Sequence, residues 1–158
     1  MKQIFSLLIL LSLFMLPSCK EEANPVQNTQ EAVKYFEAEM AHKVNPASMR
    51  NAVRDNDPNI VIIDLRRKEH FDQGHVPGAL NFPFDEWHGF DGSVTNFGDL
   101  DKNKMHYVYC YEFYCNLSAK AALLFAKNGY PVKEVRGGFK AYKDHGYPIE
   151  PDSTMPAE

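Results

Sequence analysis

The sequence predicts an α/β domain whose central sheet is mainly parallel. Residues 60–63 are a continuous run of Ile and Val, apolar on both faces, which is typical of a strand buried in a parallel sheet. Strands expected at 105–109 and 132–135 are each followed by helical spacing of apolar residues, at 116–127 and 139–145. Strands that alternate with helices in this way predict parallel strands with helices flanking the sheet.

Two helices are expected before the first strand. The first follows an approximate capping box, Asn28 and Glu31. Its apolar positions recur at helical spacing and are Val33, Phe36, Met40, Ala41 and Val44. The second begins at Asn45-Pro46, with Asn as the cap and Pro in the first turn.

The middle of the chain predicts shorter elements. A helical turn is expected over 68–73, ending at Gly74, and a strand over 79–82. Residues 85–103 are rich in Gly and Asp and predict a loop with little regular structure. Gly129 closes the helix of 116–127.

The N-terminal residues 1–18 resemble a secretory signal peptide of the lipoprotein type. Lys2 precedes an apolar run that is shorter than the ~20 residues a membrane-spanning helix needs. The run ends in Leu16-Pro17-Ser18-Cys19, which is similar to the lipobox of bacterial lipoproteins, so Cys19 is expected to carry the lipid. This predicts a lipoprotein anchored in a membrane of the Gram-negative cell envelope, at the periplasmic face or the cell surface. The alternatives are a plain signal peptide cleaved elsewhere and an uncleaved anchor.

Composition divides the rest of the chain and limits its partners. Residues 19–28 are polar and predict a tether, 29–150 the folded domain, and 151–158 a flexible tail. A hydrophobic content of 44% excludes disorder as the main state. The net charge of -4 provides no overall basic surface, so no nucleic-acid partner is expected.

Cys110 stands where a strand ends and a short loop leads into a helix. The carboxyl ends of strands face the ligand crevice in α/β sheets. Loop amides and a helix N-terminus can converge on a sulfur there and stabilise a thiolate. Cys110 is therefore the candidate nucleophile, and a small buried hydrophobe at the strand end is the alternative.

Several motifs resemble those of the rhodanese-like domain (sulfurtransferase) family, in the family's order and spacing. They extend from about residue 45 to 150 and read VIIDLR at 61–66, FDQGHVPGALN at 71–81, VYC at 108–110, GYPV at 129–132, GGF at 137–139 and GYP at 146–148. The stretch from Cys110 to Ala122 also resembles a subgroup with two cysteines in the loop. The resemblance implies a rhodanese-like fold.

The resemblance also implies a persulfide mechanism at Cys110. Its thiolate would attack a small sulfur-containing donor such as thiosulfate, and the sulfur would then pass to a thiol or another nucleophilic acceptor. The amides of residues 111–115 would cradle the persulfide. The active-site loop comprises Tyr111, Glu112, Phe113, Tyr114, Cys115 and Asn116. No cofactor is implied, and the His residues show no zinc-binding pair, so no metal is expected.

The loop departs from the Cys-x-x-Gly-x-Arg-Ser pattern of many family members. Phe113 stands at the Gly position and Cys115 at the Arg position, and Ser118 comes two residues late. A longer loop is similar to that of rhodanese-like phosphatases, but Glu112 and the lack of a loop Arg argue against a phosphate. Two cations elsewhere are candidates to replace that Arg, Lys120 and Arg136.

Cys115 has three interpretations. It could resolve a Cys110 persulfide or sulfenic acid by forming an internal disulfide, it could be a second sulfur carrier, or it could be a buried residue without a role. Two classes of function follow. The first is a sulfurtransferase using Cys110. The second is a non-catalytic binding or redox-sensing module using the Cys110/Cys115 pair, with a thiol-disulfide exchanger as a third option.

The remaining candidate residues are expected to support the site. Asp64 and Arg66 match the family's Asp-x-Arg and predict a structural charge network near the sheet end. His75 is expected to be a hydrogen-bonded core histidine. Gly137 and Gly138 would let the backbone turn tightly beside the loop.

Overall fold

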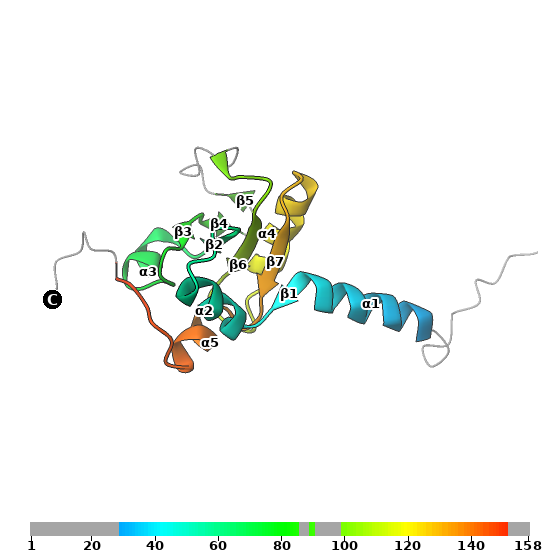
Figure 1. Ribbon diagram of the computed structural model, residues 1–158, viewed down its shortest axis with the longest axis horizontal. Coiled ribbons are helices and arrows are strands. Elements are labelled where there is room, and N and C mark those ends of the chain that lie inside the picture. The colour runs from blue at the N-terminus through cyan, green and yellow to red at the C-terminus, as the bar shows by residue number, and fades with distance from the viewer. Residues whose placement is uncertain (1–28, 86–88, 91–98, 152–158) are drawn as a thin grey trace, which may run out of the picture.

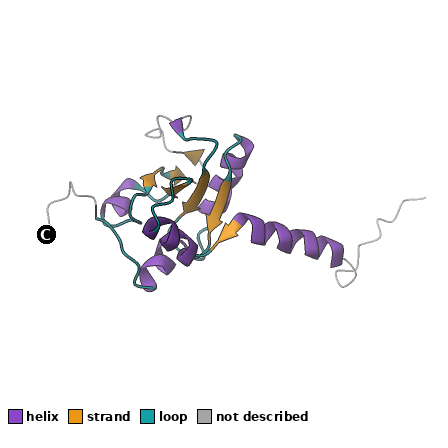
Figure 2. Ribbon diagram, viewed as in Figure 1, coloured by secondary structure: helices purple, strands orange, loops and turns teal. Residues whose placement is uncertain are grey.

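The computed structural model describes residues 29–85, 89–90 and 99–151, and in these its centre is a parallel sheet of order β1-β7-β6-β2-β3 with helices on both faces (Figures 1 and 2). The strands are β1 Lys43–Val44, β2 Ile60–Asp64, β3 Leu80–Asn81, β6 Met105–Tyr109 and β7 Val132–Val135. The helices are α1 Thr29–His42, α2 Pro46–Arg54, α3 Lys68–Asp72, α4 Leu117–Lys127 and α5 Gly138–Asp144. The fold class predicted from the sequence is confirmed.

The sheet separates two hydrophobic clusters, which explains why its central strands are apolar on both faces. On one face Ile63 and Val108 pack with Phe125 of α4. On the other face Ile62 and Tyr109 pack with residues of α2 and α5, Met49 and Tyr142. Neighbouring residues of a strand point to opposite faces, so the Ile62-Ile63 pair supplies both clusters.

The start of α2 follows the sequence prediction. Asn45 caps the helix, and its side-chain oxygen accepts a hydrogen bond of 2.9 Å from the Ser48 amide. Pro46 occupies the first turn, where its missing N–H costs nothing. This cap fixes the point at which the chain turns from β1 back onto the sheet.

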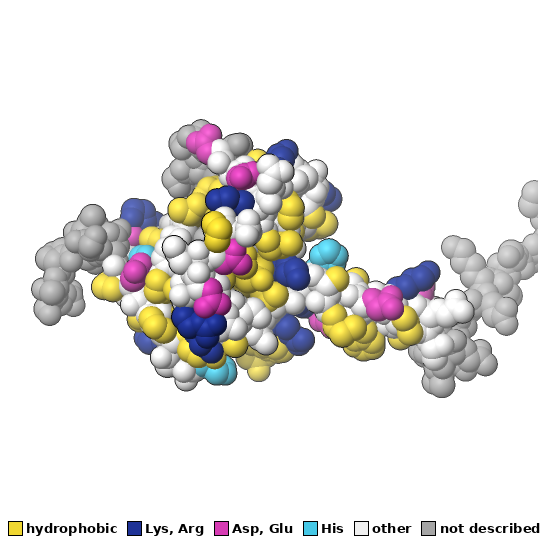
Figure 3. All heavy atoms as spheres, in the orientation of Figure 1, with side chains coloured by type: hydrophobic (Ala, Val, Ile, Leu, Met, Phe, Trp, Pro, Cys, Tyr) yellow, Lys and Arg dark blue, Asp and Glu magenta, His cyan; other side chains and the backbone are white. Residues whose placement is uncertain are grey.

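The first predicted helix, with apolar positions from Val33 to Val44, differs from the structure in two ways. It ends at His42, and Val44 lies in β1, where it pairs with Val135 of β7. None of the residues of α1 is buried, and the exposed fractions of Phe36 and Met40 are 57% and 73%. The reason is that α1 projects away from the sheet, with hydrophobic side chains along one side (Figures 1 and 3). Helical spacing predicted the element correctly but not its burial.

The prediction of a loop over 85–103 was partly wrong. β4 Phe84–Asp85 pairs antiparallel with β5 Gly89–Phe90. Two-residue strands are too short to produce a detectable period in the sequence. The strand expected over 79–82 is also shorter, since β3 comprises only Leu80 and Asn81.

Several predictions lie outside the described residues. These are the signal peptide of 1–18, the lipidation of Cys19, the tether of 19–28 and the tail after 151, and they stay predictions. Within the described ranges, no helix combines the length and the apolar character that crossing a membrane requires.

Candidate active site

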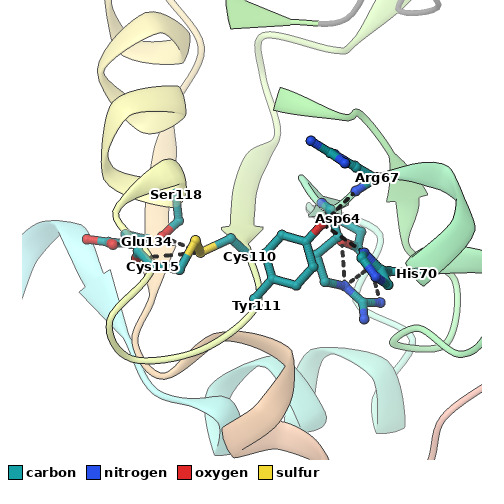
Figure 4. The surroundings of a disulfide bond; sticks show 9 residues. Asp64, Arg67, His70, Cys110, Tyr111, Cys115, Ser118 and Glu134 are labelled. Atoms are coloured by element: carbon teal, nitrogen blue, oxygen red, sulfur yellow. Dashed lines mark hydrogen bonds and ion pairs between the residues drawn. A yellow bond between two sulfur atoms is a disulfide. The ribbon is translucent and has the colours of Figure 1, made fainter. Parts of the chain in front are cut away.

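Cys110 lies at the carboxyl end of β6, directly after Tyr109, and only 1% of it is exposed. Its sulfur forms a disulfide with Cys115, across a Cα–Cα distance of 6.5 Å (Figure 4). Cys115 is half-buried and stands just before α4. The structure thus brings together the two cysteines that the sequence singled out.

The first turn of α5 holds the beginning of the loop. The Cys110 carbonyl accepts a hydrogen bond of 2.8 Å from the Phe139 amide, and the Tyr111 carbonyl accepts one of 2.8 Å from the Lys140 amide. A Cβ on Gly138 would stand 2.6 Å from the Cys110 carbonyl oxygen. Gly137 has a φ of +78°, and a Cβ there would stand 2.6 Å from the Cβ of Ala141. Gly138 is needed for the backbone to approach Cys110 this closely, and Gly137 is needed for the tight turn that begins α5.

On the other side, α3 holds the Tyr111 ring. The Tyr111 hydroxyl lies 2.9 Å from the Nδ1 of His70 and accepts a hydrogen bond of 3.3 Å from the Arg67 amide (Figure 4). This contact could not be predicted from the sequence, because an exposed His on a short helix is not distinctive. Tyr111 therefore links the loop to the end of β2, through α3.

A polar chain leads from Cys110 to the opposite edge of the site. The Cys110 sulfur lies 3.6 Å from the Ser118 oxygen, and the Ser118 hydroxyl donates a hydrogen bond of 2.9 Å to the Glu134 carboxylate. The other Glu134 oxygen is 3.8 Å from the Lys43 ammonium. Lys43 also donates a hydrogen bond of 2.7 Å to Glu39, and this bond raises the pKa of Lys43. Sequence reasoning missed Glu134 and Lys43, since neither belongs to a motif.

A pocket of about 250 Å³ opens beside the cysteines. It is lined by Glu39, Lys43, Glu112, Phe113, Cys115, Ser118, Glu134, Val135, Arg136 and Gly137. Of the two cations considered from the sequence, Arg136 lies here and Lys120 is not part of the lining. Among the described residues, no group of three His, Cys, Asp or Glu is placed to hold a metal ion.

The loop itself is open to solvent between its two cysteines. Phe113 and Tyr114 are 68% and 89% exposed, and their rings meet edge to face. Glu112 and Asn116 are exposed as well. The Cys115 amide donates a hydrogen bond of 3.0 Å to the Glu112 carbonyl, so this amide is already committed within the loop.

Asp64 and Arg66 form a buried network at the end of β2, away from the cysteine sulfurs. The Arg66 guanidinium donates to both Asp64 oxygens, at 2.6 Å for the shortest pair, and to the Gly74 carbonyl at 2.7 Å. It also stacks over the Phe139 ring at 3.8 Å. These contacts place the pair between α3 and α5, the two helices that hold the loop.

Tyr109 and His75 extend this network. The Tyr109 hydroxyl donates a hydrogen bond of 2.6 Å to Asp64 and accepts one of 3.2 Å from the Val76 amide. Burial, and then the Asp64 charge, raise the pKa of Tyr109 well above its ordinary value. His75 stacks on Phe71 at 3.7 Å and its Nδ1 lies 2.9 Å from the Phe71 carbonyl. His75 does not reach the cysteines, which suits a core histidine.

The fold and this site define an α/β domain with a cysteine pair at the end of a central strand, and comparison gives its family. The rhodanese-like domain profile matches residues 46–145, so the chain belongs to the rhodanese-like domain family. The chain is 31% identical over 96 residues to thiosulfate sulfurtransferase 16, chloroplastic, of Arabidopsis thaliana, covering 56% of this chain and 78% of that protein.

Two further relatives in sequence are much longer proteins, and another similar protein has a solved structure. An HTH-type transcriptional regulator of Mycobacterium tuberculosis is 26% identical over 58% of this chain and 38% of its own length. The adenylyltransferase and sulfurtransferase UBA4 of Vanderwaltozyma polyspora is 33% identical over 59% of this chain and 23% of its own length. The chain thus spans well under half of these two relatives. The BH2092 protein of Bacillus halodurans has a similar structure, with a TM-score of 0.68 and 26% identity over 79% of this chain and 88% of that one.

Proposed function

We propose that this chain is a sulfurtransferase that carries a sulfane sulfur as a persulfide on Cys110. The observation that carries the proposal is the disulfide. It places a second sulfur atom in bonding contact with the buried Cys110 sulfur, which supports the capacity of Cys110 to form an S–S bond at the end of β6. Relatives named as sulfurtransferases support the same chemistry.

The reaction has two displacement steps. The Cys110 thiolate supplies an electron pair to the outer sulfur of the donor, and the bond to the rest of the donor breaks. With thiosulfate, sulfite departs with that electron pair. The acceptor nucleophile then attacks the outer sulfur, and Cys110 leaves as a thiolate.

The pocket charges favour a donor with less negative charge than thiosulfate. Lys43 and Arg136 line the pocket together with three carboxylates, those of Glu39, Glu112 and Glu134. A dianion gains no net attraction from such a lining, and the Arg expected in the loop is replaced by Cys115. An alkyl persulfide, with its smaller charge, suits this pocket better.

The test uses the full chain carrying Cys115→Ser, reduced and kept free of oxygen, so that no internal disulfide can form. Thiosulfate or cysteine persulfide is added, and intact mass is recorded with time. We expect a gain of one sulfur atom on Cys110 that cyanide removes, about tenfold faster with cysteine persulfide, given the weak screening inside a pocket. A matched chain that also carries Cys110→Ser should gain no sulfur except any that peptide mapping assigns to Cys19.

Failure of both donors to add sulfur to Cys110 would refute the sulfurtransferase and favour the non-catalytic module. Sulfur added equally to the chain without Cys110 would refute the assignment of the nucleophile. Equal rates with the two donors would refute the argument from the pocket charges.

We also propose that Cys19 is the lipid-bearing residue and that the domain is tethered to an envelope membrane. The basis is the apolar run and its Leu-Pro-Ser-Cys ending. In bacterial cells fed a labelled fatty acid, the wild-type chain should incorporate the label and Cys19→Ser should not. Equal labelling of both chains would refute the lipidation.

A further inference from the structure

The two cysteines differ in access. Cys110 is 1% exposed, while Cys115 is half-buried and lines the pocket of about 250 Å³. A soluble acceptor therefore reaches the sulfur of Cys115 before that of Cys110. A sulfur carried on Cys110 has Cys115 as its nearest nucleophile.

The loop holds the two sulfurs toward each other from both ends. Its beginning is bound to α5 through the Cys110 and Tyr111 carbonyls, at 2.8 Å each. Its end is closed by the hydrogen bond from the Cys115 amide to Glu112 and continues into α4. The stretch between them, from Glu112 to Tyr114, is open to solvent. The site is therefore arranged so that an S–S bond between the cysteines forms within the native fold.

We propose that Cys115 resolves the Cys110 persulfide and that the product is hydrosulfide; this rests on the persulfide function proposed above. The Cys115 sulfur attacks the inner sulfur, that of Cys110, and forms the disulfide. The bond between the Cys110 sulfur and the outer sulfur breaks, and the outer sulfur leaves with the electron pair. The proton of the Cys115 thiol goes to this leaving group, which departs as HS⁻.

The electrons balance without a further oxidant. The sulfane sulfur is reduced to sulfide, and the two cysteines are oxidised to the disulfide. The disulfide then needs a dithiol reductant to return to the dithiol state. That reductant would attack Cys115, the accessible sulfur, and expel the Cys110 thiolate, which regenerates the nucleophile. The overall activity is that of a sulfane-sulfur reductase driven by a dithiol.

The experiment loads the fully reduced full chain with one equivalent of cysteine persulfide without oxygen. Free hydrosulfide is trapped with a bimane reagent, and intact mass and peptide mapping follow both cysteines. Three chains are compared: wild type, Cys115→Ser and the control Ala119→Ser, which adds the same hydroxyl at an exposed position of α4. A phosphine-free reduction is used, because phosphines remove sulfane sulfur.

For wild type and Ala119→Ser we expect about one hydrosulfide per chain and the loss of two hydrogens across Cys110 and Cys115. For Cys115→Ser we expect a lasting gain of one sulfur on Cys110 and at least a tenfold drop in hydrosulfide release. After dithiothreitol has reduced the oxidised wild type and has been removed, a second equivalent of cysteine persulfide should give a second round of release.

Two outcomes overturn this proposal while the sulfurtransferase stands. One is a wild-type chain that keeps the sulfur on Cys110 as long as Cys115→Ser does. The other is transfer of the sulfur to Cys115, which would make Cys115 a second carrier. If neither wild type nor Cys115→Ser ever gains sulfur, the sulfurtransferase proposal itself fails, and this inference fails with it.

Discussion

Replacing Glu134 by Gln should make Cys110 more reactive. Ser118 donates its proton to Glu134, so it presents oxygen lone pairs to the Cys110 sulfur 3.6 Å away. The Glu134 carboxylate also places a negative charge behind that hydroxyl. Both effects disfavour the sulfur anion that attacks the donor. Gln keeps the size and the accepting oxygen but removes the charge.

The size of the effect follows from the distances. With Ser118 between them, the Glu134 carboxylate and the Cys110 sulfur are roughly 6 Å apart, and two such charges repel by about 2–3 kcal/mol at an effective dielectric constant near 20. The Lys43 ammonium, 3.8 Å from the other Glu134 oxygen, offsets part of this. A net effect of about 1–1.5 kcal/mol on the thiolate remains; because a more stable thiolate is also less nucleophilic, this corresponds to about a threefold increase in rate.

The assay is the alkylation rate of Cys110 by iodoacetamide in the reduced Cys115→Ser chain, followed by intact mass at one pH and low salt. Glu39→Gln is the matched control, because Glu39 contacts Lys43 but not Ser118. We expect a much smaller change from this control. A slower or unchanged rate in Glu134→Gln, or an equal gain in Glu39→Gln, would refute the reasoning.

Three further predictions concern the scaffold. Tyr109→Phe should lower the free energy of unfolding by about 2–3 kcal/mol in urea titrations, because it removes a buried hydrogen bond to a carboxylate. Gly138→Ala should abolish sulfur loading of Cys110, because the new Cβ would displace the Cys110 carbonyl. The control Gly146→Ala has open space around the new Cβ, so it should lower the free energy of unfolding by only about 1 kcal/mol and leave sulfur loading intact. Burial lowers the pKa of His106 in β6, so the unfolded chain binds a proton at this residue at a higher pH than the folded chain does. The free energy of unfolding should therefore fall as the pH drops from about 7 to 5, by at most about 1.4 kcal/mol per pH unit, and His106→Asn should flatten this slope.

The elements that could be predicted from the sequence are those whose burial leaves a pattern. Ile60–Ile63 reads as a buried parallel strand because both of its faces are covered, by α4 on one side and by α2 and α5 on the other. The pairs β4–β5 and β1–β7 span two residues each, too few to establish a period. The exposure of α1 was also unpredictable, because spacing defines an apolar side but not whether anything packs against it.

The residues of the candidate site also fall into those that could be predicted from the sequence and those that could not. Cys110, Cys115, Asp64 and the Gly137-Gly138 pair could be found because each belongs to a local motif at a turn or strand end. Glu134 could not be found, since it reaches the site only through the pairing of β7 with β6 and through Ser118. Contacts between segments distant in the chain depend on the order of the strands in the sheet. A single sequence carries little information on that order, and therefore on which distant side chains meet.

Sheet order also explains which cation lies at the pocket beside a loop that has no Arg. β1 adds to the free edge of β7, with Lys43 opposite Glu134, and so brings a cation to the pocket from the N-terminal segment. That cation is shared between Glu39 and Glu134, at 2.7 and 3.8 Å, rather than left free for an anionic donor. An Arg at position 115 would have bound such a donor, whereas Cys115 supplies a sulfur at the same place. Under the proposed sulfurtransferase function, both changes act in one direction: they weaken the binding of a small dianion and favour sulfur-to-sulfur exchange within the loop.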